Sequence, residues 1–126
     1  MVQVEISQFT GECNTWREGL RQYRDEFSQD KTKLQQAASQ PLSKELLQDV
    51  EHLHNQFHIQ LINIHDLKQS IKTHERRLNF EMAVNQSQLN EETVASHENL
   101  FDQYQTLEHT LRDLRDEFSQ FLNRTQ

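Results

Sequence analysis

Apolar side chains recur every three or four residues along three long stretches of the chain, and this spacing restricts the fold more than any other feature. Alternating steps of three and four place such side chains on one face of an α-helix, as in a coiled-coil seam. The first seam holds one acidic residue among its members, which are Phe9, Cys13, Trp16, Leu20, Tyr23, Phe27, Asp30, Leu34 and Ala37. It predicts a helix over about residues 7–39, after a loose lead-in at residues 1–8.

The second stretch begins after a clear break. Pro41 interrupts the first helix, and Ser43 is a suitable N-cap for a helix over about residues 43–85. Its seam consists of Leu46, Val50, Leu53, Phe57, Gln60, Ile64, Leu67, Ile71, His74 and Leu78. The pattern thins after Leu78, which predicts fraying or a kink near residues 79–86 and a turn over residues 85–90.

The third stretch starts at Asn90, an N-cap candidate followed by two glutamates that suit the positive end of a helix. Its seam, in a helix over about residues 90–124, consists of His97, Leu100, Tyr104, Leu107, Leu111, Leu114, Phe118 and Phe121. Polar members of the seams, such as Asp30, Gln60 and His74, are interpreted as buried polar layers that set the register of the helices.

Composition agrees with an entirely helical chain. Two glycines and one proline in 126 residues are too few for the tight turns of a β-sandwich or barrel. Short connections between long helices make sequential neighbours antiparallel. We therefore predict one all-α domain over residues 1–126, three long antiparallel helices in an up-down-up, coiled-coil-like bundle.

Charge and cysteine content narrow the possible partners and location. Thirteen basic against twenty acidic residues give a net charge of −7, which disfavours nucleic-acid binding. No apolar run reaches the roughly 20 residues of a membrane span, and no basic and apolar leader is recognisable, so we expect a cytoplasmic protein that binds no membrane. The single cysteine, Cys13, forms no internal disulfide and is expected as a small buried side chain.

Histidines cluster on the second predicted helix, where five of the seven fall within 23 residues. Helical geometry puts His54, His58 and His65 on one stripe, with Glu51 one turn before His54. Neutral imidazoles on adjacent turns can share a metal ion, so Glu51, His54, His58 and His65 form an alternative zinc or iron site. The first interpretation is structural: these three rings are half-buried at the edge of the apolar face.

A short internal repeat links the first and third helices. Residues 20–29 match residues 111–120 at eight of ten positions. Because these helices are predicted to be parallel, the repeats should lie within about one helical turn of each other in height. They should then present Phe27 and Phe118 to the same part of the second helix, around residues 54–58.

The charged residues of the repeat have two interpretations. Arg21 with Asp25, and Arg112 with Asp116, are spaced to pair along their own helices and to stabilise packing. The sharper hypothesis is that the two copies form a duplicated docking face for one partner. We favour the first, because charged helix faces are ordinarily solvated.

No catalytic motif accompanies the helical pattern. The chain has no glycine-rich phosphate loop, no Gly-x-Ser-x-Gly elbow and no Cys-x-x-Cys. Trp16 is expected in the core opposite the level of His65, with Asp66 or a backbone carbonyl accepting its indole N–H. We therefore expect no enzymatic activity and no cofactor under the first interpretation.

The second helix carries more apolar residues than one seam requires, which favours self-association. Ile59, Leu61 and Ile62 lie off the seam and would be covered by a second copy or by another helical protein. The function favoured from the sequence is a non-enzymatic protein–protein interaction or scaffold module, a homodimer or the partner of another helical protein. The alternative is the metal-binding bundle built on the histidine stripe.

Overall fold

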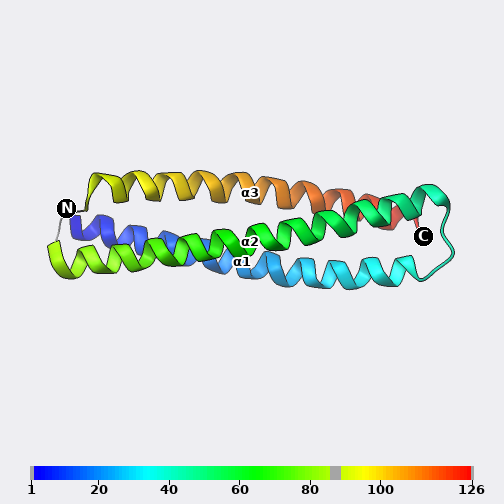
Figure 1. The fold of residues 1–126 in the computed structure, drawn as a ribbon, viewed down its shortest axis with the longest axis horizontal. Helices are drawn as coiled ribbons and strands as arrows, with labels where there is room; N and C mark the ends of the chain where they lie inside the picture. Colours follow the sequence, from blue (N-terminus) through cyan, green and yellow to red (C-terminus); the bar gives the residue numbers. More distant parts are fainter. Residues whose placement is uncertain (1, 86–88, 126) are drawn as a thin grey trace.

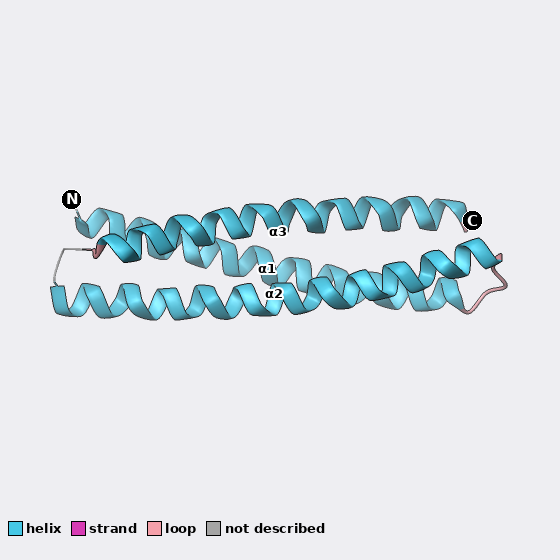
Figure 2. Cartoon of the chain, turned by 45° about the horizontal axis from the view of Figure 1, so that its top comes forward, coloured by secondary structure: helices cyan, strands magenta, loops and turns pink. Residues whose placement is uncertain are grey.

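The computed structural model describes residues 2–85 and 89–125 and consists of three long helices packed side by side. They are α1 (Val2–Ala38), α2 (Lys44–Asn85) and α3 (Glu91–Arg124). Figure 1 shows that α1 begins at the end of the bundle where α2 passes to α3, and that α3 ends beside the α1–α2 connection. The all-α, up-down-up bundle is confirmed: α1 and α3 run in the same direction, and α2 runs in the opposite direction (Figure 2).

The first helix begins earlier than predicted. The loose lead-in at residues 1–8 is wrong for the described part, because α1 is already helical at Val2. The buried side chain of Ile6 explains the difference: it lies three residues before Phe9 and continues the seam toward the N-terminus. Alternation of Val2, Val4 and Ile6 resembled a strand, but burial at the helical spacing decides the conformation.

Both predicted N-caps are present. The Ser43 hydroxyl accepts a hydrogen bond from the Leu46 backbone N–H at 3.2 Å. The Asn90 side chain accepts from Glu92 N–H at 3.1 Å, with Asn90 in an extended backbone conformation. Side-chain acceptors of this kind satisfy N–H groups that have no partner within a helix.

The break expected near residues 79–86 is absent up to Asn85, because α2 is one continuous helix to that residue. Residues 86–88, which belong to the predicted turn, lie outside the described part. Glu81 helps to explain the continuity: its buried carboxylate accepts a hydrogen bond from Asn90 N–H at 3.1 Å and so ties the last turns of α2 to the start of α3.

The core follows the predicted seams along the whole bundle. Its centre contains three phenylalanines, one from each helix: Phe57 lies 5.6 Å from Phe27 and 5.2 Å from Phe118, measured between ring centroids. The prediction that both copies of the repeat present a phenylalanine to residues 54–58 of α2 is confirmed. Burial of such side chains contributes roughly 1.5–3 kcal/mol each.

Polar layers interrupt this core where the seams predicted them. Asp30 and Gln60 are buried. Asp30 accepts from Arg115 Nε at 3.0 Å, and Gln60 accepts from the Asn63 side chain at 3.1 Å. The ion pairs predicted within the repeats are not formed: Arg21 contacts Glu18, and Arg112 contacts Glu108.

None of the helices in the described residues is long and apolar enough to cross a membrane.

Candidate metal centre

One layer of the bundle brings together a thiol and two imidazoles, one from each helix. The ligand atoms of Cys13 on α1, His74 on α2 and His97 on α3 all lie within 4.8 Å of one another. The three residues are 0%, 5% and 4% exposed. Within residues 2–85 and 89–125, no other group of three or more His, Cys, Asp or Glu residues meets this distance.

Seam position explains why these three side chains meet. Each occupies an inward-facing step of its own helix, and the up-down-up arrangement brings the three steps to one height. Aromatic side chains then enclose the layer from α1. The Phe9 ring stacks on the His97 imidazole with centroids 3.7 Å apart, and the Trp16 ring lies 4.9 Å from it on a tilted plane.

Hydrogen bonds link the two imidazoles to each other and to Glu12. His97 Nε2 lies 3.0 Å from Glu12 Oε1, and His97 Nδ1 lies 3.0 Å from His74 Nε2. The contacts fit the neutral tautomer of His97 with its hydrogen on Nε2, which donates to the Glu12 carboxylate. In this tautomer the Nδ1 lone pair of His97 is directed into the layer and accepts from His74 Nε2–H. A carboxylate that orients a histidine in this way is the usual outer partner of a metal ligand.

Burial favours the uncharged forms of His74 and Cys13. It lowers the pKa of His74 to about 4, with the neighbouring His97 acting in the same direction. It raises the pKa of the Cys13 thiol to about 12, and the nearby carboxylates of Glu75 and Glu12 add to that shift. At neutral pH His74 is therefore neutral, which a metal requires, whereas Cys13 keeps its proton until a cation displaces it.

The charges around the layer suit a divalent cation. Arg17 Nε lies 2.6 Å from Glu75 Oε1, a close ion pair whose angle falls outside hydrogen-bond geometry, so this pair contributes no net charge. The carboxylates of Glu12 and Glu81 and the guanidinium of Arg77 also lie near the three side chains. An ionised Cys13 and the acidic neighbours would offset the charge of a divalent cation, which lowers the cost of burying it.

The geometry is also close to that of a zinc site. Zinc takes Cys sulfur at about 2.3 Å and His nitrogen at about 2.0 Å in a tetrahedral arrangement, which puts ligand atoms roughly 3.3–3.8 Å apart. The three atoms here already lie within 4.8 Å of one another. Binding needs small side-chain rotations, loss of the Cys13 proton, and transfer of the His74 proton from Nε2 to Nδ1.

Comparison with known proteins gives no further guide. No family model, no curated protein and no solved structure matches the chain.

The histidine stripe predicted on α2 has a different environment. Glu51, His54, His58 and His65 are all exposed, so the expected half-burial of the three rings is wrong. They lie on a part of α2 that neither neighbouring helix covers. The structure does not bring three of them together within ligand distance, and His65 Nδ1 is 3.4 Å from Asp66 Oδ1.

The residues predicted for self-association are divided between core and surface. Ile59 and Ile62 are 45% and 47% exposed on the outer face of α2, whereas Leu61 packs partly against the core. Trp16 is buried in the core as expected, but its ring lies against α3, 6.0 Å from Phe101 and 4.9 Å from His97, rather than opposite His65. This position places Trp16 at the level of the Cys13, His74 and His97 layer.

The sequence places Cys13, His74 and His97 on the three seams, but the pattern within any one helix does not show that they meet. His74 was expected as a hydrogen-bonded polar layer, which is confirmed, and Cys13 as a buried side chain, which is also confirmed. The missing step was to align the seams of three helices. Only His74 and His97 bring imidazoles onto a seam, and Cys13 is the single thiol on one.

Proposed function

We propose that this chain is a non-enzymatic helical bundle that binds a divalent transition-metal ion, zinc, through Cys13, His74 and His97. The observation that carries the proposal is the convergence of three buried ligand atoms, from three different helices, within 4.8 Å. Thiolate and imidazole together are donors that zinc prefers. Such an ion would join all three helices at one layer, so binding would stabilise the fold.

The Glu12–His97 hydrogen bond supports the same function. It holds His97 in the tautomer that directs Nδ1 toward Cys13 and His74. Glu12 is therefore a positioning residue rather than a ligand, and its replacement should weaken the metal without removing a donor. Loss of an outer partner of this kind typically costs about 10–100-fold in affinity.

Zinc binding by the reduced protein tests the proposal directly. Competition against a zinc-binding dye should give one zinc per chain, with release of about one proton per zinc near pH 7 as the Cys13 thiol ionises. Cobalt(II) in place of zinc should give a sulfur-to-cobalt charge-transfer band in the near ultraviolet. Cys13→Ala should abolish that band and weaken zinc binding by about 100-fold or more, while Glu12→Gln should keep the band.

The exposed histidines supply the matched control. His54→Ala with His58→Ala removes two imidazoles from the solvent face of α2 and should leave the zinc affinity and the cobalt spectrum unchanged. Circular dichroism checks that each variant remains helical. Absence of zinc binding in the folded wild-type chain contradicts the proposal, as does loss of binding in the His54 and His58 variant alone. The second result would favour the stripe of Glu51, His54, His58 and His65.

A second candidate function is an interaction or scaffold module that binds its own copy or another helical protein. It is supported by Ile59 and Ile62, whose side chains are half exposed on α2. Changing both to Glu should lower the mass of the complex in solution, and an unchanged mass would contradict this interface.

We further propose a cytoplasmic location, because a thiol that serves as a metal ligand must stay reduced.

A further inference from the structure

The outer face of α2 carries a second stripe of side chains at helical spacing, on the side of the helix opposite the buried seam. Its members follow one another in steps of four and three residues and are all exposed: Ile62, Asp66, Gln69, Thr73, Arg76 and Phe80. Ile62 and Phe80, at the two ends of this outer stripe, are 47% and 64% exposed. Alternating steps of three and four give the outer stripe the spacing of a coiled-coil seam.

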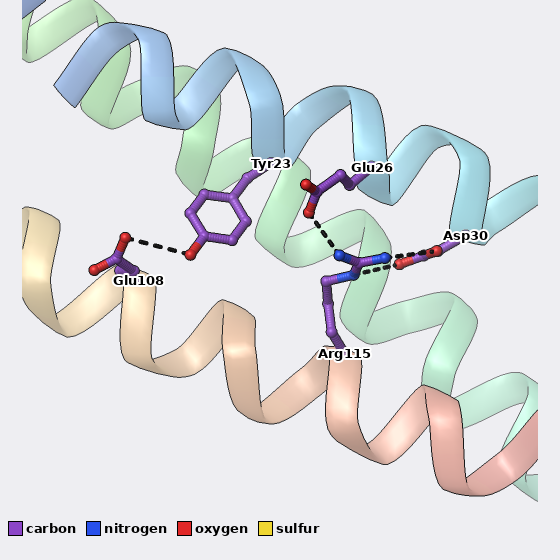
Figure 3. A network of polar contacts seen from close by, with 5 residues as sticks. All are labelled: Tyr23, Glu26, Asp30, Glu108 and Arg115. Carbon is purple, nitrogen blue, oxygen red and sulfur yellow. Dashed lines mark hydrogen bonds and ion pairs between the residues drawn. The ribbon is translucent and has the colours of Figure 1, made fainter. Parts of the chain in front are cut away.

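The packing of the three helices explains why this face of α2 is open. Tyr23 of α1 donates to Glu108 Oε2 of α3 at 3.3 Å (Figure 3). Arg115 of α3 donates to Glu26 of α1 at 2.6 Å and to Asp30 of α1 at 3.0 Å. These contacts hold α1 and α3 together, and α2 packs against both of them with its buried seam. The opposite side of α2 therefore remains at the surface.

The spacing makes the outer stripe symmetric about the level of residue 71. Its steps are 4, 3, 4, 3 and 4 residues, so they read the same from either end. A two-fold axis that crosses α2 at right angles makes this helix antiparallel to its own copy. Each member then faces the member that lies equally far beyond the axis. Gln69 faces Thr73 of the second copy, where an amide and a hydroxyl can share a hydrogen bond.

The ends of the outer stripe bring apolar side chains together in this arrangement. Ile62 faces Phe80 of the second copy. One step farther out, Ile59, which is 45% exposed, faces Ala83 of the second copy. The symmetry makes each contact twice, so apolar surface is covered on both sides of the axis. Removing such surface from water favours association.

The charged members of the outer stripe also match. Asp66 faces Arg76 of the second copy, and this contact too occurs twice. Within one helix the two residues are ten positions apart, about 15 Å, and cannot pair with each other. The Asp66 side chain is 72% exposed, and its contact with the exposed His65 at 3.4 Å costs little to lose. Charge complementarity therefore favours a second copy in this orientation.

Other antiparallel registers of the same face match less well. With the axis half a heptad nearer the N-terminus of α2, Ile59 faces Arg76, so an apolar side chain meets a charge. With the axis between residues 60 and 61, Ile59 faces Ile62 and Arg76 faces Glu45. Phe80 then lies opposite the chain that precedes α2 of the second copy, and stays outside the helical contact. Only the register centred on residue 71 covers both ends of the outer stripe.

We propose that the outer stripe of α2 is the contact surface of an antiparallel, two-fold symmetric dimer of this chain. The proposal rests on the second candidate function, an interaction module, and names its partner as a second copy. Lys72 lies near its own copy in this dimer, at the rim of the contact, where water and salt screen the like charges. The contact is on the side of α2 opposite the buried His74, so the dimer does not depend on a bound metal.

Sedimentation equilibrium of the full chain, with EDTA present to remove metal ions, tests this dimer. Asp66→Arg and Arg76→Asp each place like charges opposite each other twice, so self-association of either variant should fall by roughly tenfold or more. An equimolar mixture of the two variants should recover the dimer as a heterodimer, and the double variant should restore self-association. Phe80→Glu should also dissociate the dimer, whereas a register centred between residues 60 and 61 predicts no effect.

Two matched controls separate pairing from net charge. Asp25→Arg and Lys33→Asp make the same charge changes at exposed positions of α1 and should leave the dimer intact. A wild-type chain that stays monomeric at low salt overturns the proposal. So does a dimer that the variants of Asp66 and Arg76 form as readily as the wild type, or one that Phe80→Glu leaves intact.

The second candidate function has a separate outcome in the same assay. Dissociation by Ile59→Glu with Ile62→Glu, but not by the changes at Asp66, Arg76 and Phe80, would keep the interaction module and overturn the two-fold pairing. A dimer that none of these changes dissociates contradicts both.

Discussion

Acid should destabilise this bundle through one buried histidine, before general acid unfolding begins. His74 has an ordinary pKa of 6.5 in the unfolded chain and about 4 in the fold, because burial and the adjacent His97 disfavour its charged form. Below pH 6.5 the unfolded state binds a proton that the folded state does not, so stability falls as pH decreases and levels off below about pH 4. For these two pKa values, linkage gives a loss of about 2 kcal/mol between pH 8 and pH 5.

Urea unfolding followed by circular dichroism at pH 8 and pH 5, with EDTA present, measures this loss. His74→Gln is the informative variant, because its side-chain amide can donate to His97 Nδ1 without titrating. The free energy of unfolding of the variant should lose about 2 kcal/mol less than that of the wild type over the same pH range. Equal losses in the two proteins would refute the assignment of the acid sensitivity to His74. His54→Ala, an exposed histidine, should behave as the wild type.

Three further results follow from the packing. Phe57→Ala should lower the free energy of unfolding by about 3–5 kcal/mol in urea titrations, because it empties the centre of the three-phenylalanine cluster; a loss below about 1 kcal/mol would contradict that packing. Gly19→Ala should gain about 1 kcal/mol of helix propensity only when Tyr104→Phe removes the hydroxyl that a Cβ would meet, and an equal gain in both backgrounds would contradict the contact. The Cys13 thiol should react with a disulfide reagent only as the chain unfolds in urea, since burial raises its pKa to about 12; rapid reaction of the folded protein would show that the layer opens.

Prediction from the sequence succeeded where neighbours along one helix carry the information. The seam of α2 from Leu53 to Leu78 is buried as expected, and Ser43 and Asn90 cap their helices. These features depend on contacts within a few residues, for which helical periodicity and capping chemistry are sufficient. The start of α1 was missed because three alternating apolar residues fit two conformations equally well until a neighbouring helix buries Ile6.

Prediction failed where several helices must be aligned at once. His54, His58 and His65 are close in sequence, and their stripe suggested a site, yet the neighbouring helices leave them exposed. Cys13 and His97 are 84 positions apart, and no local pattern indicates that they meet. Their distance depends on the register between helices, which a shift of one helical turn, about 5.4 Å, would change completely.

The sequence by itself therefore determined the class of fold, the number of helices and the residues each turns inward, because these follow from periodicity and from the scarcity of turn formers. Only the tertiary structure decided which inward residues share a layer. The register that joins Cys13, His74 and His97 is chosen by the packing of three seams against one another. That packing depends on the volume and shape of side chains from distant parts of the chain, which no pattern within one helix contains.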